Sequence, residues 1–274
     1  MKKYAFGVDI GGTTCKIGFF DTNGTLLDKW EIKTNTENNG ESILSDVAKA
    51  VDNKLAQEAI SKDDVQGIGI GVPGPVDSQG VVHRCVNLGW GVVNVAEELG
   101  NLTGLTIKVG NDANVAALGE MWQGGAKGSK DVIMVTLGTG VGGGIIVDGK
   151  VVAGFNGAGV EIGHITVNND EIEACNCGQY GCLEQYTSAT GIVRLAKRKL
   201  AKSSEETSIR EIPNLTAKDV FDAAKAGDAI AIGLVDEVCE ILGSTLSNIA
   251  CVVNPEIIVI GGGVSKAGDI LLDN

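Results

Sequence analysis

Short apolar runs bounded by glycine or polar turns alternate along this chain with longer segments whose apolar residues recur at helical spacing. The short runs are typical of buried strands, and apolar positions three and four apart indicate helices. Together they predict an α/β fold. The predicted strands are 4–10, 15–21, 25–32, 67–72, 105–109, 132–137, 145–147 and 255–260. The predicted helices are 43–60, 113–122, 188–202, 217–226 and 229–246.

A strand–glycine turn–strand pattern occurs twice. One constant offset pairs Asp9 with Thr136, Gly11 with Gly138, and Asp21 with Asp148. We interpret the pattern as an internal duplication, which predicts two related halves that face each other across a cleft with a glycine turn on each wall. Two unrelated glycine hairpins are the alternative.

Length and charge limit the fold and the class of partner. At 274 residues the chain is long for one compact core, so we predict a small lobe at 1–118 and a large lobe at 119–274. A net charge of −13 argues against a nucleic-acid-binding surface, which needs a basic face. No long apolar run predicts a membrane span, and the first strand follows Met1-Lys2-Lys3 too closely for a signal peptide.

Cysteine spacing predicts a metal site. His164 precedes Cys175, Cys177 and Cys182, a set of one imidazole and three thiols that suits a closed tetrahedral zinc site. Scattered core cysteines beside a surface histidine are the alternative. Seven cysteines, three of them with metal-like spacing, favour a reducing cytoplasm over a disulfide scaffold. The other four are expected to fill cores: Cys15, Cys85, Cys239 and Cys251.

The two glycine turns are candidate phosphate-binding loops. Glycine lets backbone N–H groups approach phosphate oxygens, and threonine hydroxyls add neutral donors. Asp9 would hold a magnesium ion that bridges phosphates. Neither turn has the spacing of a P-loop. The candidate residues are Gly11, Gly12, Thr13 and Thr14 in the first turn and Gly138, Thr139 and Gly140 in the second.

Asn111 and Asp112 stand between a predicted strand and a predicted helix. One reading is that either residue only caps the helix. The other is that Asp112, kept ionised by the helix N-terminus, acts as general base toward a sugar hydroxyl. Carboxylates, amides and an imidazole would hold the remaining hydroxyls, and the candidates are Asn87, Asn111, Glu161, His164 and Glu184.

These motifs together resemble the ROK family of repressors and sugar kinases. The matching segments are 9–14, 71–76, 111–114, 135–144, 161–164, 175–184 and 261–263, so the resemblance spans the chain. It implies a two-lobed, actin-like (ribonuclease H-like) ATPase fold and a cytoplasmic ATP-dependent hexose kinase of carbohydrate metabolism. The activity most expected is that of a glucokinase.

The resemblance also implies roles for residues. Asp112 aligns with the family's catalytic base, and Asn111, Glu161, His164 and Glu184 with its sugar ligands. His164, Cys175, Cys177 and Cys182 align with structural zinc ligands, and Gly261 and Gly262 with the adenosine-facing turn. The implied cofactors are ATP, Mg²⁺ and structural Zn²⁺, and the implied assembly is a homodimer or homotetramer.

Three further expectations concern specificity and length. A kinase for another hexose or N-acetylhexosamine, such as a fructokinase or N-acetylmannosamine kinase, remains an alternative. A sugar-responsive repressor is a distant one, because it needs a helix-turn-helix where only Met1-Lys2-Lys3 stand. Family members normally continue a few dozen residues further, so we expect a chain shortened at its C-terminus.

Overall fold

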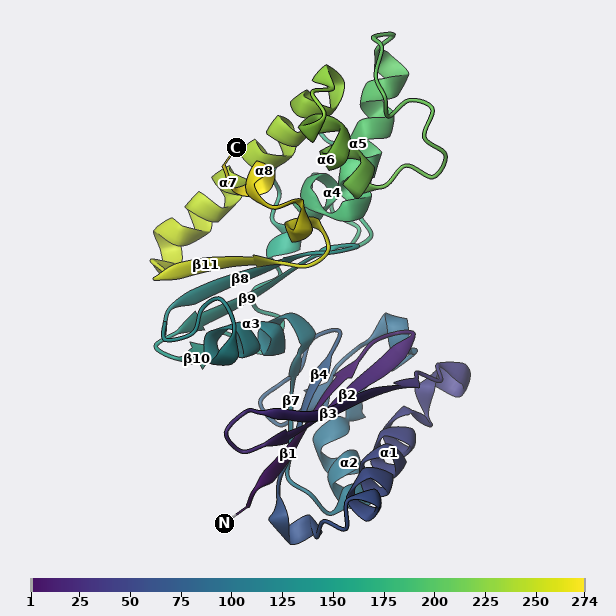
Figure 1. The fold of residues 1–274 in the computed structure, drawn as a ribbon, viewed down its shortest axis with the longest axis vertical. Coiled ribbons are helices and arrows are strands. Elements are labelled where there is room, and N and C mark those ends of the chain that lie inside the picture. Colours follow the sequence, from purple (N-terminus) through teal and green to yellow (C-terminus); the bar gives the residue numbers. More distant parts are fainter. Residues whose placement is uncertain (1, 274) are drawn as a thin grey trace. The chain divides into compact units, whose positions relative to one another are not determined.

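The structure, a computed structural model, describes residues 2–273 and contains two compact units (Figure 1). The first unit comprises the residues up to Gly124 together with Val151–Val160. The second comprises Gly125–Lys150 and the residues from Glu161 onward. Helices accompany a partly parallel sheet in each unit, which confirms the predicted α/β class. None of the helices within residues 2–273 has the length and apolarity needed to cross a bilayer.

The first unit is built on a five-stranded sheet with the order β3-β2-β1-β4-β7. β1 pairs antiparallel with β2 and parallel with β4, which in turn pairs parallel with β7. The strands are β1 (Tyr4–Ile10), β2 (Thr14–Asp21), β3 (Leu26–Lys33), β4 (Val65–Val72) and β7 (Ile107–Asn111).

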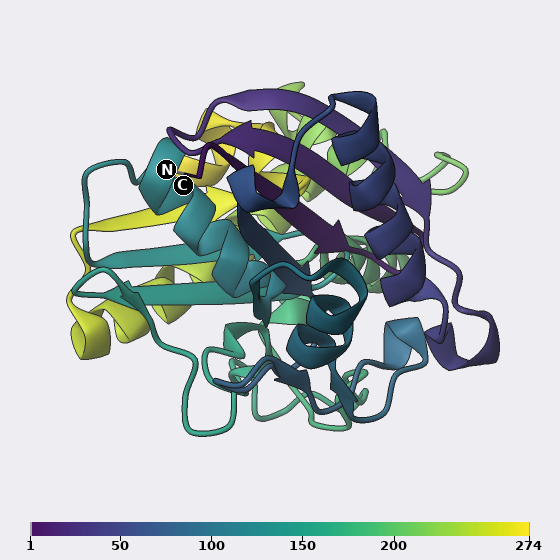
Figure 2. The same ribbon diagram turned by 90° about the horizontal axis from the view of Figure 1, so that it is seen from below.

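Helices α1 (Ile43–Gln57) and α2 (Val95–Thr103) pack against each other and complete the core of this unit (Figures 1 and 2). Alternate residues of a strand point to opposite faces, so Phe6 and Val8 enter this core while Asp9 stays exposed on the other side. The apolar core therefore fixes which face of β1 presents its carboxylate.

Helix α2 and a small hairpin were not predicted from the sequence. Asn94 caps α2 by accepting the Glu97 N–H at 3.1 Å, and Gly104 ends the helix with a φ of +70°. This Asn-x-x-Glu start and glycine stop were readable signals. The hairpin strands are β5 (Val81–Val82) and β6 (Val93–Asn94). The single-turn helices are η1 (Glu37–Gly40), η2 (Lys62–Asp64), η3 (Val86–Leu88), η4 (Ile162–His164) and η5 (Val264–Ala267).

The second unit contains a four-stranded sheet with the order β10-β9-β8-β11. β8 is buried along nearly its whole length, as expected of a central strand. It pairs antiparallel with β9 and parallel with β11. The strands are β8 (Val132–Leu137), β9 (Val141–Val147), β10 (Lys150–Val151) and β11 (Ile257–Gly261).

Helices of the second unit lie together beside this sheet (Figure 1). Asp228 caps the longest of them, α7, which continues past the predicted end at residue 246 until Asn254 adopts a left-handed conformation. The first unit adds α3 (Asp112–Gln123), which follows β7 directly. The helices of the second unit are α4 (Glu184–Thr187), α5 (Ala189–Lys202), α6 (Ala217–Lys225), α7 (Ala229–Val253) and α8 (Asp269–Leu272).

The shared order β3-β2-β1-β4 and β10-β9-β8-β11 confirms the predicted duplication. The two turns differ in length, however. Ile10 pairs with Cys15 across four residues, whereas Leu137 pairs with Val141 across three. The constant sequence offset therefore fails beyond the turn, and Asp21 and Asp148 do not hold equivalent register positions.

Candidate functional site

The first glycine turn is anchored by Thr34, which sequence reasoning missed. The Thr34 hydroxyl donates to the Gly11 carbonyl at 2.6 Å, and the Thr34 N–H donates to the Thr13 carbonyl at 2.9 Å. Within the turn the Gly11 N–H donates to the Thr14 carbonyl at 3.0 Å. Thr34 is buried, so these bonds fix the turn from its inner side and leave Gly12 exposed for a ligand.

Asp9 and Asn87 lie close to this turn. The Asp9 carboxylate is exposed and stands 3.7 Å from the Lys16 ammonium group on the neighbouring strand. A Cβ on Gly12 would lie 3.4 Å from the Asn87 carbonyl oxygen, so η3 packs directly against the turn. The first unit thus brings its predicted phosphate loop beside a predicted sugar ligand.

Asn111 caps helix α3, which was one of the two interpretations of this segment in the sequence. Its Oδ1 accepts the N–H groups of Ala113 at 3.0 Å and Asn114 at 3.2 Å. Its Nδ2 donates to the Gly74 carbonyl at 3.3 Å. Both ends of the amide are therefore engaged, and the cap fixes the backbone that carries Asp112.

Asp112 is the first residue of α3 and is reached by solvent. Its Oδ1 accepts the Ala113 N–H at 2.8 Å, which favours the ionised form. The surrounding protein and the negative charge of Asp9 act the other way and raise the pKa of Asp112 above its ordinary value. A carboxylate with a raised pKa is better matched to accept a proton near neutral pH than an ordinary aspartate is.

The second glycine turn is held by the start of α5. The Gly138 carbonyl accepts the Ala189 N–H at 2.8 Å, and the Thr139 carbonyl accepts the Thr190 hydroxyl at 2.7 Å. These contacts use the carbonyl groups of the turn as acceptors. A Cβ on Gly138 would meet no atom within 4 Å, so this position is open to a ligand.

Gly261 and Gly262 lie beside that same turn. Gly261 pairs with Thr136 at the end of the sheet, and Gly262 follows with a φ of +88°. A Cβ on Gly262 would come within 2.7 Å of the Leu137 backbone, immediately before Gly138. The second unit therefore gathers the predicted phosphate turn and the predicted adenosine turn at one edge of its sheet.

The structure brings the four predicted metal ligands together. One donor atom from each of His164, Cys175, Cys177 and Cys182 lies within 4.8 Å of the others. The Sγ atoms of Cys177 and Cys182 are 3.6 Å apart, and His164 Nδ1 is 4.0 Å from the Cys175 Sγ. Ligands at zinc–sulfur distance in a tetrahedron are about 3.8 Å apart, so the set fits zinc.

The cysteines of this cluster would need a nearby cation in order to ionise. Burial and the neighbouring thiols raise the pKa of Cys182 to about 12, and burial raises the pKa of Cys175. Thiolates in this position are unfavourable unless a positive charge joins them. A divalent ion supplies that charge and holds the cysteines deprotonated.

Glu184 connects this cluster to the second glycine turn. Its Oε2 accepts the Val141 N–H at 3.2 Å, and its Oε1 lies 3.3 Å from the Cys175 Sγ. Glu161 is exposed and immediately precedes η4, three residues before His164, and its carbonyl accepts the His164 N–H at 3.0 Å. Both predicted sugar carboxylates thus flank the thiol cluster.

Cysteines outside the cluster follow the sequence expectation with one exception. Cys15, Cys85 and Cys239 are buried among apolar residues. Cys251 is exposed, so its assignment to a core was wrong. It lies in the C-terminal part of α7 that the sequence did not predict to be helical, on a face that no core residue covers.

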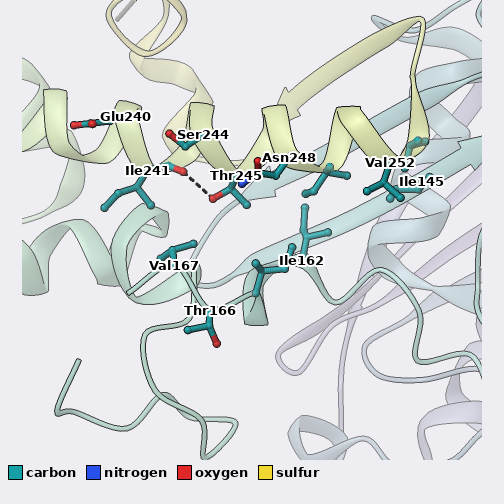
Figure 3. Close-up of a pocket in the computed structure, with 13 residues that line it drawn as sticks. Ile145, Ile162, Thr166, Val167, Glu240, Ile241, Ser244, Thr245, Asn248 and Val252 are labelled. Carbon is teal, nitrogen blue, oxygen red and sulfur yellow. Dashed lines mark hydrogen bonds between the residues drawn. The ribbon is translucent and has the colours of Figure 1, made fainter. Parts of the chain in front are cut away.

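A groove of about 800 Å³ in the second unit adjoins the segment 161–164, since Ile162 lines it (Figure 3). It is bounded by α7 and by the residues around η4, and its lining is largely apolar. Thr245 turns its hydroxyl back to the Ile241 carbonyl at 2.7 Å, which leaves no polar group aimed into the groove from this residue. None of the predicted site residues lines it.

Comparisons with known proteins agree with these motifs. The chain is 47% identical over 98% of its length to a protein named glucokinase from Halalkalibacterium halodurans, of which it covers 83%. It resembles the crystal structure of a ROK family glucokinase from Streptomyces griseus in complex with glucose and AMPPNP, with a TM-score of 0.77 and 35% identity over 98% of this chain and 86% of that one.

A third likeness is to a ROK family transcriptional regulator, a homologue of the Escherichia coli MLC protein. Its TM-score is 0.88 and its identity 26%, over 98% of this chain and 68% of that one. The likenesses confirm the predicted actin-like sugar-kinase fold. The model of the ROK family matches residues 5–274. The chain therefore belongs to the ROK family.

Proposed function

We propose that this protein is an ATP-dependent glucokinase, which transfers the γ-phosphate of MgATP to the 6-hydroxyl of glucose. The observation that carries the proposal is 47% identity, over nearly the whole chain, to a protein named glucokinase. The repressor-like relative shares only 26% identity, so it does not favour a regulator. Kinases of other hexoses or N-acetylhexosamines are less favoured, because the relative with 47% identity is named glucokinase.

Asp112 is the proposed general base. The oxygen of the 6-hydroxyl attacks the γ-phosphorus, its proton passes to Asp112, and the bond from phosphorus to the ADP oxygen breaks. Phosphoryl transfer needs mainly positioning and charge stabilisation from the protein. The fixed start of α3, with Asn111 as its cap, supports the positioning of Asp112.

The remaining residues are proposed to bind. Asn87, Asn111, Glu161, His164 and Glu184 hold sugar hydroxyls, which donate hydrogen bonds to carboxylate and amide oxygens and accept them from amide N–H groups. The two glycine turns offer N–H groups and threonine hydroxyls to phosphates, and Gly261 and Gly262 face the adenosine. Asp9 would hold Mg²⁺, which neutralises phosphate charge when bound.

Zinc is proposed as a structural ion held by His164, Cys175, Cys177 and Cys182. Four protein ligands leave no open coordination position, so the ion supplies rigidity and not a reactive water. With Nδ1 facing the thiols, the other ring nitrogen of His164 is left for a sugar hydroxyl. From the resemblance to the family we also propose that the protein is cytoplasmic and forms a homodimer or homotetramer.

The test is an ATP-dependent assay with a panel of sugars: glucose, fructose, mannose, N-acetylglucosamine and N-acetylmannosamine. The proposal expects the highest kcat/KM with glucose. A higher kcat/KM with another sugar would mean that the protein is a kinase of that sugar and not a glucokinase. No ATP turnover with any sugar, from folded and zinc-loaded protein, would refute a kinase.

A further inference from the structure

A buried polar network lies next to the segments that carry the thiol cluster, and no sugar, nucleotide or metal role has been given to its residues. At its centre the Glu171 side chain is fully buried. Its Oε2 lies 2.7 Å from Arg194 and 2.8 Å from Arg198, and it accepts the Tyr186 hydroxyl at 2.7 Å. Its Oε1 accepts the N–H groups of Ile172 and Glu173 at 3.0 and 3.1 Å.

Arg194 extends the network toward the chain that carries the cluster. Its Nε donates to Glu173 Oε2 at 2.6 Å, and its NH1 donates to the Gln185 carbonyl at 3.3 Å. The guanidinium also lies over the Tyr186 ring, 5.9 Å from its centre. One side chain of α5 thus holds both the segment before Cys175 and the short helix α4 that begins at Glu184.

Gln185 joins the two sides directly. Its Nε2 donates to the Glu173 carbonyl at 3.0 Å, and its Oε1 accepts the Cys182 N–H at 3.1 Å. The amide therefore spans from a residue two before Cys175 to the backbone of Cys182. Both cysteines belong to the thiol cluster, and Glu184 is the immediate neighbour of Gln185.

Stability alone is a poor explanation for this arrangement. The loss of hydration offsets most of the attraction in a buried ion pair, so such pairs add little net stability. A carboxylate with all its acceptor positions occupied is, in contrast, an effective way to fix one geometry. Groups just outside the ligands of a metal typically orient those ligands and tune their affinity.

From this geometry we infer that Glu171, Arg194 and Gln185 are positioning residues that set the spacing of the thiol cluster and the direction of the Glu184 carboxylate. They are not among the residues proposed to bind sugar or nucleotide. They act on the metal through the backbone at Glu173 and Cys182, and on the proposed sugar ligand through α4. The part that concerns sugar rests on the proposed function.

The experiment compares Glu171→Gln and Arg194→Lys with wild type, using full-length protein loaded with zinc. Zinc affinity is measured by competition with a chromophoric chelator, without sugar or ATP. Glu171→Gln is expected to weaken zinc binding at least tenfold and to raise KM for glucose about tenfold, with KM for ATP changed less than twofold. Arg194→Lys keeps the positive charge but loses the planar, forked guanidinium group, so we expect a smaller loss of zinc affinity than in Glu171→Gln.

Lys54→Met is the matched control. Lys54 is a buried cation of the first unit, 2.6 Å from Asp28 and 2.8 Å from Glu58. Its loss is expected to lower stability and to leave zinc affinity and KM for glucose unchanged. A general effect of losing a buried ion pair would instead change all variants alike, and would overturn the positioning role.

Unchanged zinc affinity in folded Glu171→Gln also overturns the inference, as does wild-type protein that binds no zinc. If Glu171→Gln does not fold, the zinc affinity of Arg194→Lys decides on the same criterion. The two proposals fail separately. Wild-type protein that binds zinc but phosphorylates no hexose defeats the kinase proposal and leaves the zinc measurement valid.

Discussion

Glu184 Oε2 accepts the Val141 N–H at 3.2 Å, so one carboxylate ties the second glycine turn to the proposed sugar-binding segment. The other oxygen of Glu184 faces Cys175 at 3.3 Å. A change in the turn is therefore expected to displace a carboxylate that is proposed to bind the sugar. In the second unit, Glu184 therefore connects the second glycine turn directly to the thiol cluster.

Gly140→Ala tests this connection. A Cβ at Gly140 would overlap Glu184 Oε2, so the carboxylate must move. Misplacing a binding group by about 1 Å lowers activity roughly a hundredfold, and we expect a loss of kcat/KM for glucose of that order. The measurement is steady-state kinetics with glucose as the varied substrate.

Gly243→Ala is the control for Gly140→Ala. This glycine lies within α7, where a Cβ meets nothing within 4 Å, so alanine is expected to stabilise the helix by up to about 1 kcal/mol. Wild-type kinetics in Gly140→Ala would show that Glu184 has room to keep its place, and would remove the steric argument.

Asp112→Asn tests the base. The amide keeps the size and the hydrogen bond to Ala113 but cannot take a proton, so kcat is expected to fall roughly a hundredfold or more. Glucose affinity, measured by calorimetry, is expected to change little. A kcat near that of wild type would exclude Asp112 as the base.

The pH dependence of wild-type kcat/KM for glucose, which reports the pKa values of the free enzyme, gives a second test of Asp112. The base works ionised, so activity is present above its pKa and lost as pH falls through it. Partial desolvation by the surrounding protein and the charge of Asp9 raise the pKa of Asp112, so the acid limb should lie above the ordinary aspartate value of about 4. An acid limb below that value would contradict the environment described for this carboxylate.

Thr34→Val tests the anchor of the first turn. Valine has the same shape but cannot donate to the Gly11 carbonyl, so this partly buried acceptor loses its partner. We expect about 1–3 kcal/mol less stability and a higher KM for ATP than for wild type. Thr245→Val is the matched control, because that buried hydroxyl bonds only within its own helix. Equal changes in KM for ATP would contradict the anchoring role.

How far the sequence could predict this molecule depends on the range of the interaction. The glycine turns and the start of α3 are encoded by neighbouring residues, and they were readable. The Thr34 anchor lies 23 residues from Gly11 and has no local signature. The same applies to the pairing of Glu171 with Arg194, since neither spacing nor periodicity links a loop carboxylate to a helix arginine.

Pattern reading also fails where one residue changes the register. The two glycine turns look alike in the sequence, yet one spans four residues and the other three between paired strand ends. Strand pairing depends on cross-strand hydrogen bonds, which a constant sequence offset does not describe. The thiol cluster could be predicted from the sequence because its residues are close along the chain. Three of its donors lie within eight residues, and only His164 is more distant.

Cys177→Ala tests whether zinc supports sugar binding. With one of four ligands gone, the protein is expected to lose zinc and bind glucose at least tenfold more weakly, since Glu161 and Glu184 flank the cluster. Zinc content is measured by elemental analysis. Cys251→Ala is the control, because Cys251 is exposed and lies outside the cluster. Zinc-free Cys177→Ala with normal glucose affinity would separate the metal from the sugar site.

Asp228 gives the last prediction, which concerns stability and not chemistry. It caps α7 by accepting the Ala231 N–H at 3.1 Å, and it also accepts the Ser208 N–H at 2.6 Å and the Thr207 hydroxyl at 2.9 Å. Burial alone would raise the pKa of Asp228, but these hydrogen bonds outweigh it and lower the pKa to about 2.

A carboxylate whose pKa is lower in the folded state stabilises the fold above its unfolded pKa, and this stabilisation is lost as pH falls toward the folded pKa. Asp228→Ala should therefore reduce the free energy of unfolding by about 1–2 kcal/mol at pH 7 and by much less at pH 2. Urea unfolding followed by circular dichroism measures both. A deficit that stays constant from pH 7 to pH 2 would mean that packing, and not the ionised cap, accounts for the loss.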